Sequence, residues 1–133
     1  MFGVQGASAT KDVDAIFEPV KEIRNASHRI AERHDLRLDW LNLAVKTFVV
    51  DHPRQILFDL SNLIVTVPEA DYLLAMKMLA LRSDTEDEND AEFLIARLGL
   101  KSSQEVINIV ADYYPKKEVK LKTVFWLNEY FAE

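Results

Sequence analysis

Residues 72–82 read Tyr-Leu-Leu-Ala-Met-Lys-Met-Leu-Ala-Leu-Arg, and Lys77 is the only charge inside this apolar stretch. A run of helix-forming side chains that is apolar on nearly every face is typical of a helix surrounded by other elements. Pro68, Glu69 and Asp71 come just before it, and an acidic first turn suits the helix dipole. The stretch therefore predicts a helix through the middle of the core.

Three more helices are predicted after this one. Residues 87–98 have helical spacing of apolar side chains and end at Gly99. Ser102 and Glu105 form a capping box for the next helix. Residues 119–131 predict a last helix, whose inward side chains we expect to be Val124, Phe125, Leu127, Tyr130 and Phe131.

The segments before the central helix favour strands. Residues 11–17 alternate acidic and apolar side chains, which predicts a strand with Asp12 and Asp14 on one side. Residues 18–34 have helical spacing, and residues 36–40 alternate again and predict a second short strand. Residues 56–59 and 63–67 predict two more strands, joined by a tight turn at Ser61-Asn62.

The fold class that follows is α+β, with a strand-rich half at 1–67 and a helical half at 68–133. The 133 residues, 49% of them hydrophobic, suffice for one compact core, so we expect a single domain. The net charge of -6 disfavours broad binding to phosphate backbones. No apolar stretch is long enough for a membrane span, which predicts a cytoplasmic protein without membrane contact.

The absence of cysteine excludes disulfides and thiolate chemistry, so carboxylates are the sharpest candidates for a site. Asp12 and Asp14 are two residues apart on a predicted strand, where like charges repel unless a cation lies between them. Mg²⁺ prefers such hard oxygen ligands together with substrate phosphates. The alternative is that both acids are solvated at the edge of a strand.

Several blocks of the chain resemble the minimal nucleotidyltransferase family that includes the AbiEii-type toxins of abortive-infection and toxin-antitoxin systems. They are Thr-Lys-Asp-Val-Asp-Ala-Ile-Phe at 10–17, Leu-Asp-Trp-Leu-Asn at 38–42, the stretch 72–82, Asp87 and Asp90, Phe93-Leu94, and Leu-Gly-Leu at 98–100. The resemblance extends from about residue 9 to residue 115.

The resemblance implies a small nucleotidyltransferase-like mixed sheet with helices, like that of DNA polymerase β, followed by a helical C-terminal lobe. It implies that Asp12 and Asp14 bind Mg²⁺ for the transfer of a nucleotide from a nucleoside triphosphate. A third metal-binding and catalytic carboxylate is expected from a neighbouring strand, with Asp39 as first choice and Asp59 as second.

Lys77 matches the family's helix lysine, which implies a catalytic role and a contact with a phosphate or a catalytic carboxylate. Ser8 and Thr10 are the other nucleotide-binding candidates. For Lys77 the alternatives are an ammonium that reaches water or a structural pair with Asp87 or Asp90.

In members of this family, a strand and a Gly-Ser motif at the start of a helix come before the paired aspartates in sequence. Backbone N–H groups of the Gly-Ser motif hold the triphosphate. Only eleven residues precede Asp12 here, so we expect that segment to be missing. An arginine that often precedes the Thr-Lys-Asp block is replaced by Ser8 or Ala9. A sheet edge left open in this way favours self-association, which predicts a homodimer.

These observations predict a nucleotidyltransferase-like protein of a toxin-antitoxin or phage-defence type, with metal-dependent transfer reduced or lost. The alternative is a non-catalytic dimeric scaffold that binds a cognate antitoxin or toxin. An RNA acceptor has no support beyond a strip of arginines for which a solvated helix face is the other interpretation: Arg24, Arg29, Arg33 and Arg37.

Overall fold

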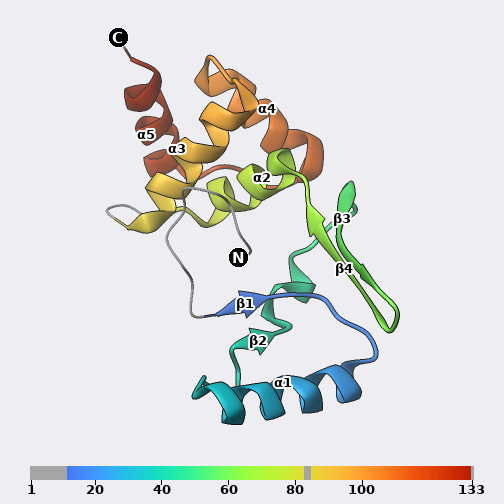
Figure 1. Cartoon of the computed structure of the whole chain (residues 1–133). Helices are drawn as coiled ribbons and strands as arrows, with labels where there is room; N and C mark the ends of the chain where they lie inside the picture. Colours follow the sequence, from blue (N-terminus) through green and yellow to red (C-terminus); the bar gives the residue numbers. More distant parts are fainter. Residues whose placement is uncertain (1–11, 83–84, 133) are drawn as a thin grey trace. The chain divides into compact units, whose positions relative to one another are not determined.

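The computed structural model describes residues 12–82 and 85–132, coloured along the chain in Figure 1. These residues form five α-helices and two sheets of two strands each, so the α+β class is confirmed. The chain divides into two compact units, Met1–Val49 and Val50–Glu133. The predicted strand-rich and helical halves meet at residue 67, whereas the boundary between the compact units lies at residue 49. Among the described residues, no helix is long and apolar enough to cross a membrane.

The first unit is built on a strand, a helix and a second strand. Strand β1 (Val13–Asp14) leads to α1 (Val20–His34), and β2 (Leu41–Asn42) follows, with a short 3₁₀-helix η1 at Ala44–Thr47. The two strands pair in parallel, with Val13 opposite Leu41. A parallel pair needs a long crossover connection, and α1 provides it. The helix predicted over residues 18–34 is confirmed, but it begins at Val20, after the N-cap Pro19.

The predicted second strand at 36–40 is wrong by a few residues. Residues 37–40 form a turn, in which the Trp40 backbone N–H donates to the Arg37 carbonyl at 3.2 Å, and the strand begins at Leu41. The Trp40 side chain explains the turn, because its Nε1 donates to the backbone carbonyl of Ser27 on α1 at 2.9 Å. A tertiary contact thus overrides the local alternation. The predicted strand at 11–17 is also shorter in the structure, at Val13–Asp14.

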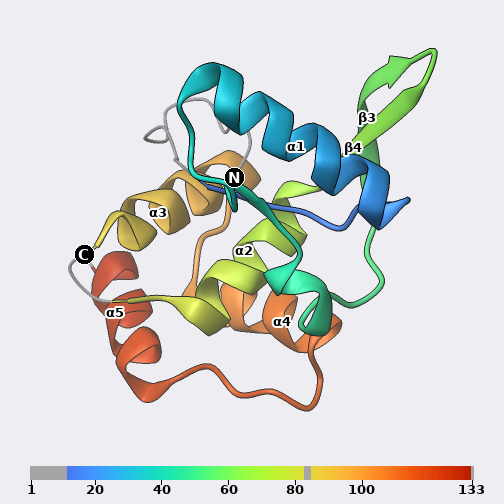
Figure 2. The ribbon, with the colours of Figure 1, turned by 90° about the horizontal axis from the view of Figure 1, so that it is seen from below.

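The second unit starts with a hairpin and continues as four helices. Strands β3 (Arg54–Leu60) and β4 (Leu63–Pro68) pair antiparallel around the predicted turn at 61–62. The helices follow directly: α2 (Ala70–Ala80), α3 (Glu86–Leu98), α4 (Ser103–Tyr113) and α5 (Leu121–Phe131). Figure 2 shows α3 and α4 beside α2, and both make contacts with it.

The prediction that the stretch from Tyr72 runs through the core is confirmed. Tyr72, Leu74, Ala75 and Met78 on α2 are all 0% exposed. Burial of one such apolar side chain contributes about 1.5–3 kcal/mol relative to exposure in water. The other buried side chains of this unit follow α2 in the chain, on the three later helices or at the C-caps of α2 and α4: Leu81, Ala91, Leu94, Ile95, Val106, Val110, Tyr114, Thr123 and Leu127.

Helix termini in the second unit follow the predicted signals. Gly99 ends α3 with a φ of 67°, a left-handed conformation that glycine adopts without the penalty of a Cβ. The side chain of Ser102 accepts a hydrogen bond from the Glu105 backbone, and the Glu105 side chain accepts one from the Ser102 backbone. The capping box is therefore confirmed.

The inward face of α5 differs from the prediction. Thr123 and Leu127 are its buried residues, whereas Phe125 is 62% exposed and Tyr130 is also exposed. Residues 123 and 127 are one helical turn apart and define the inward stripe, which leaves residue 125 on the other side. The predicted helix is confirmed, but its rotation about its axis could not be read from a segment with apolar residues on most faces.

Tyr72 also fixes the beginning of the second unit. Its hydroxyl accepts a hydrogen bond from the Val50 backbone N–H at 3.1 Å and lies 2.7 Å from the Tyr114 hydroxyl. The His52 ring stacks on the Tyr72 ring, with 3.8 Å between centroids. Burial is the main cause that raises the pKa of Tyr114, and the hydrogen bond with Tyr72 is the second. The hairpin therefore leaves the helical core from an anchored segment.

Replacing Ser102 with alanine should lower the free energy of unfolding by about 1 kcal/mol, because the first turn of α4 loses one of its cap hydrogen bonds. Urea denaturation followed by circular dichroism measures this change. Ser103→Ala is the matched control, because Ser103 lies within the helix and alanine is a better helix former. Equal stability of the two variants would contradict a stabilising role of the capping box.

Candidate functional site

Two of the three predicted metal-binding acids meet at one guanidinium in the first unit. The parallel pairing of β1 and β2 brings Asp12, just before β1, beside the turn that carries Asp39. Arg37 lies between them, with its Nη2 3.0 Å from Asp39 Oδ2 and its Nη1 4.0 Å from Asp12 Oδ2. The two carboxylates thus share a positive charge supplied by the chain itself.

Exposure limits what this ion-pair cluster contributes to stability. The side chains of Arg37 and Asp39 are about two-thirds exposed and that of Asp12 is about half exposed. Ion pairs in contact with water contribute between zero and about 1 kcal/mol, since solvent screens the charges. The cluster therefore has little importance for folding. The Asp39 side chain remains open to a ligand, whereas Oδ1 of Asp12 is buried.

Asp14 and Asp59 take no part in the ion pairs of Arg37. Asp14 is exposed at the end of β1, opposite Asn42 on β2. Asp59 is exposed on β3, in the second unit. Over residues 12–82 and 85–132, no group of three or more histidine or acidic side chains is arranged to hold a metal ion. Carboxylate oxygens suit Mg²⁺ chemically, but the described arrangement joins two of them through Arg37.

Ser8 and Thr10 lie outside the described residues. Asp12, Asp14 and Asp39 belong to the first unit, and Lys77 belongs to the second. A shared site of the acids with Lys77 therefore stays a prediction.

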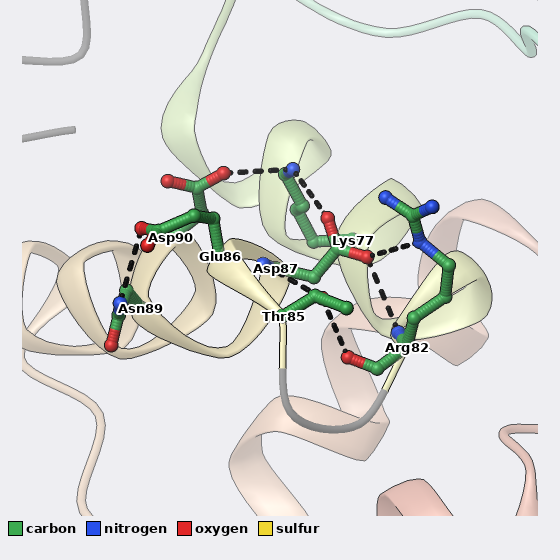
Figure 3. Close-up of polar contacts among 7 residues, drawn as sticks. All are labelled: Lys77, Arg82, Thr85, Glu86, Asp87, Asn89 and Asp90. Atoms are coloured by element: carbon green, nitrogen blue, oxygen red, sulfur yellow. Dashed lines mark hydrogen bonds and ion pairs between the residues drawn. The ribbon is translucent and has the colours of Figure 1, made fainter. Parts of the chain in front are cut away.

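Lys77 is held by two acids at the beginning of α3 (Figure 3). Its Nζ lies 2.9 Å from Asp90 Oδ2 and 3.4 Å from Asp87 Oδ1. The three side chains are largely buried, with 24% of Lys77, 14% of Asp87 and 16% of Asp90 exposed. Since a buried ammonium needs anionic partners, the structural pairing foreseen as one alternative for Lys77 is present. A contact with phosphate stays a prediction.

Asp87 connects the end of α2 with the start of α3. Its Oδ2 accepts hydrogen bonds from the Arg82 Nε at 2.9 Å and from the Arg82 backbone N–H at 3.3 Å. Thr85 completes the connection, because its Oγ1 donates to the Arg82 carbonyl at 2.8 Å and accepts from the Asp87 backbone at 3.2 Å. Thr85 is thus the N-cap of α3.

The electrostatics of Asp87 favour its charged form. Burial alone raises the pKa of Asp87, but the hydrogen bond from Arg82 and the positive charges of Lys77 and Arg82 lower it, and the net pKa lies below the ordinary value. Asp87 is therefore a carboxylate at neutral pH, and its ionisation stabilises the folded chain.

Sequence reasoning missed the two arginines that organise these clusters. The sequence indicates Arg37 only as part of a basic strip over α1 and the residues after it, although its position two residues before Asp39 allows a local ion pair. Arg82 is the last residue of the apolar stretch, and its contact with Asp87, five residues later, joins the segment after α2 to the first turn of α3.

The comparison with known proteins gives no match: no protein-family model, no curated protein and no solved structure is significantly similar to the chain. The resemblance to nucleotidyltransferase-like toxins therefore stays a prediction that depends on the quoted sequence blocks. The geometry of the two clusters is the structural ground on which a function can be proposed.

Replacing Asp87 with asparagine should lower the free energy of unfolding by about 1–3 kcal/mol at pH 7, because Lys77 and Arg82 lose a shared anion. The pKa of Asp87 is lower in the folded chain, so its contribution is complete well above 3.8 and is lost as the pH falls below that value. The difference between wild type and variant should therefore shrink at pH 3. Urea denaturation at both pH values measures it.

Glu92→Gln is the control for this comparison, because it removes one negative charge from the same helix outside the cluster. If Asp87→Asn lowers the free energy of unfolding only as much as Glu92→Gln does, or by the same amount at pH 3 as at pH 7, the ion pairs of Asp87 do not stabilise the fold.

Proposed function

We propose that this chain is a nucleotidyltransferase-like protein of a bacterial toxin-antitoxin or phage-defence type. In this proposal Asp12 and Asp39 belong to a site for Mg²⁺ and a nucleoside triphosphate. The observation that carries the proposal is the convergence of Asp12 and Asp39 on one positive charge beside the parallel pair β1 and β2. Asp12 is one of the two metal ligands that the resemblance implies, Asp39 is the first choice for the third acid, and the two residues are 27 positions apart in the sequence.

The chemistry of this cluster agrees with the proposal. Acids that lie close together need a cation, and in the described structure a guanidinium provides it. Asp12 and Asp39, together with the exposed Asp14 two residues after Asp12, would hold Mg²⁺. When bound, that ion would neutralise the charge of the transferred phosphoryl group. Arg37 is itself a natural phosphate ligand, because its planar guanidinium can donate two parallel hydrogen bonds.

Lys77 has a separate place in this proposal. Its ammonium is engaged by Asp87 and Asp90, so its first role is to hold α2 and α3 together. Its side chain is not fully buried, and an ammonium has three N–H donors, which leaves the proposed phosphate contact chemically open. Catalysis by Lys77 is the part of the proposal that needs the most direct test.

A non-catalytic scaffold is the second candidate, and one observation favours it. Arg37 already serves as counter-ion between Asp12 and Asp39, so the acids do not require a metal in order to lie near one another. In this case the fold serves to bind a partner such as a cognate antitoxin or toxin. The two candidates differ in whether a divalent cation and a nucleotide bind to the acidic cluster.

Isothermal titration calorimetry with Mg²⁺ and each of the four ribonucleoside triphosphates distinguishes them. The wild-type chain should bind at least one triphosphate in a Mg²⁺-dependent manner. The double variant Asp12→Asn, Asp14→Asn should bind it at least about tenfold more weakly, because metal affinity falls by such factors even when only the supporting groups of a metal site change.

Asp35→Asn is the matched control. It removes a carboxylate from the same unit, and asparagine tolerates the left-handed conformation that Asp35 adopts at φ 55°. Wild type and Asp35→Asn should bind alike. Absence of Mg²⁺-dependent binding to the wild-type chain would reject the enzyme proposal and leave the scaffold. A Lys77→Met variant that binds nucleotide as well as wild type would remove Lys77 from the site.

A further inference from the structure

The hairpin β3–β4 carries the largest group of exposed apolar side chains on adjoining strands of the described chain. All seven residues of β3 are exposed, and Leu63 and Ile64 continue the exposure on β4. Within the described residues β3 pairs only with β4. Two strands alone are marginally stable in water, and an open edge offers unpaired N–H and C=O groups to another strand.

The pairing register assigns each side chain to a face. Residues opposite one another in an antiparallel pair share a face, and successive residues of β4 alternate between faces. Phe58 pairs with Val65 and Leu60 pairs with Leu63, so these four apolar side chains share one face. Gln55, opposite Val67, belongs to the same face. Three pairs form the other face: Arg54 with Pro68, Ile56 with Thr66, and Asp59 with Ile64.

An irregularity at Leu57 gives β3 a self-complementary pattern. Leu57 has no partner on β4, because the register shifts between Ile56 and Phe58. Arg54 and Asp59 therefore lie on the same face although they are five residues apart, with Ile56 between them. Over residues 12–82 and 85–132 neither charge takes part in an ion pair.

We infer that β3 pairs antiparallel with β3 of a second copy of this chain, about a two-fold axis at Ile56, and so completes a four-stranded sheet. When Leu57 is also left unpaired in the ladder between the two copies, Arg54 lies opposite Asp59 of the second copy. The two-fold symmetry then places Asp59 of the first copy opposite Arg54 of the second. Opposite charges directly across a ladder stabilise it, and like charges destabilise it. The occupant of the open edge is thus a chain with the charge pattern of β3 itself.

The other edge of the hairpin lacks these properties. Strand β4 reads Leu-Ile-Val-Thr-Val-Pro, which has no charge to set a register. Its last residue, Pro68, has no N–H to donate to a neighbouring strand. Pairing through β3 also joins the apolar faces of the two hairpins, those of Phe58, Leu60, Leu63 and Val65, into one wider surface. The inference is independent of whether the acidic cluster binds a nucleotide.

Single-cysteine variants test the pairing, because the chain contains no cysteine. Ile56→Cys places a thiol on the axis, about 5 Å in Cα distance from its equivalent, which a disulfide can bridge. We expect a covalent dimer on mild oxidation, seen by non-reducing electrophoresis. Ile64→Cys is the matched control, since Ile56 and Ile64 are 63% and 61% exposed and share a face. In the proposed dimer, residue 64 of one copy lies three strand spacings, about 14 Å, from residue 64 of the other, so Ile64→Cys should not crosslink.

Charge reversal supplies the second test. Arg54→Glu and Asp59→Lys each place two like-charged pairs across the axis, and each should weaken dimerisation about tenfold or more. The double variant Arg54→Glu, Asp59→Lys exchanges the two charges and should restore dimerisation to near the wild-type level. Analytical ultracentrifugation over a range of concentrations measures the dissociation constants. Neither residue is buried, so the variants should keep the circular dichroism of the wild type.

Three results would overturn the inference. The first is a wild-type chain that stays monomeric at high micromolar concentration. If the thiol of Ile56→Cys is protected from alkylation in that monomer, the chain covers its own hairpin. A disulfide that forms equally well in Ile64→Cys would show non-specific collision. Failure of the double charge variant to restore dimerisation would show that the charges do not set the register.

Discussion

The second unit depends on burying α2 among later helices while still satisfying the one charge that α2 contains. Four of its side chains are fully inaccessible to water, and this burial supplies the main driving force for packing α3 and α4 around it. Lys77 cannot enter such an environment alone, because an unpaired ammonium loses its hydration without compensation. The acids at the start of α3 supply the partners and thereby determine where α3 begins relative to α2.

Two kinds of contact therefore hold the helices, and they act differently. Apolar packing stabilises the unit without specifying one arrangement in detail. The contacts of Asp87 with Lys77 and with both the side chain and the backbone of Arg82 are directional, and they select one connection between α2 and α3. Tyr72 has a similar double role, because its ring is buried while its hydroxyl binds the backbone at Val50.

The first unit has a smaller framework and a more exposed charge cluster. A short parallel pair and one helix bring Asp12, Arg37 and Asp39 together, with Trp40 fastening the turn to α1. The exposure of these charges means that folding does not require their pairing. The proposed function assigns this exposed cluster to a ligand, and the titration with Mg²⁺ and nucleotide tests that assignment.

The amino-acid sequence by itself determined the helices of the second unit, the hairpin turn and the capping box, because these depend on local periodicity and on residues close in the chain. It also singled out Lys77, since a charge inside an apolar helix demands an explanation. Only the tertiary structure decided the position of β2, where Trp40 bonds to a distant helix, and the inward face of α5, where most faces are apolar. The same holds for the approach of Asp12 to Arg37, because pairing of strands separated by a whole helix brings these two charges together, whereas the contact of Arg37 with Asp39 is local.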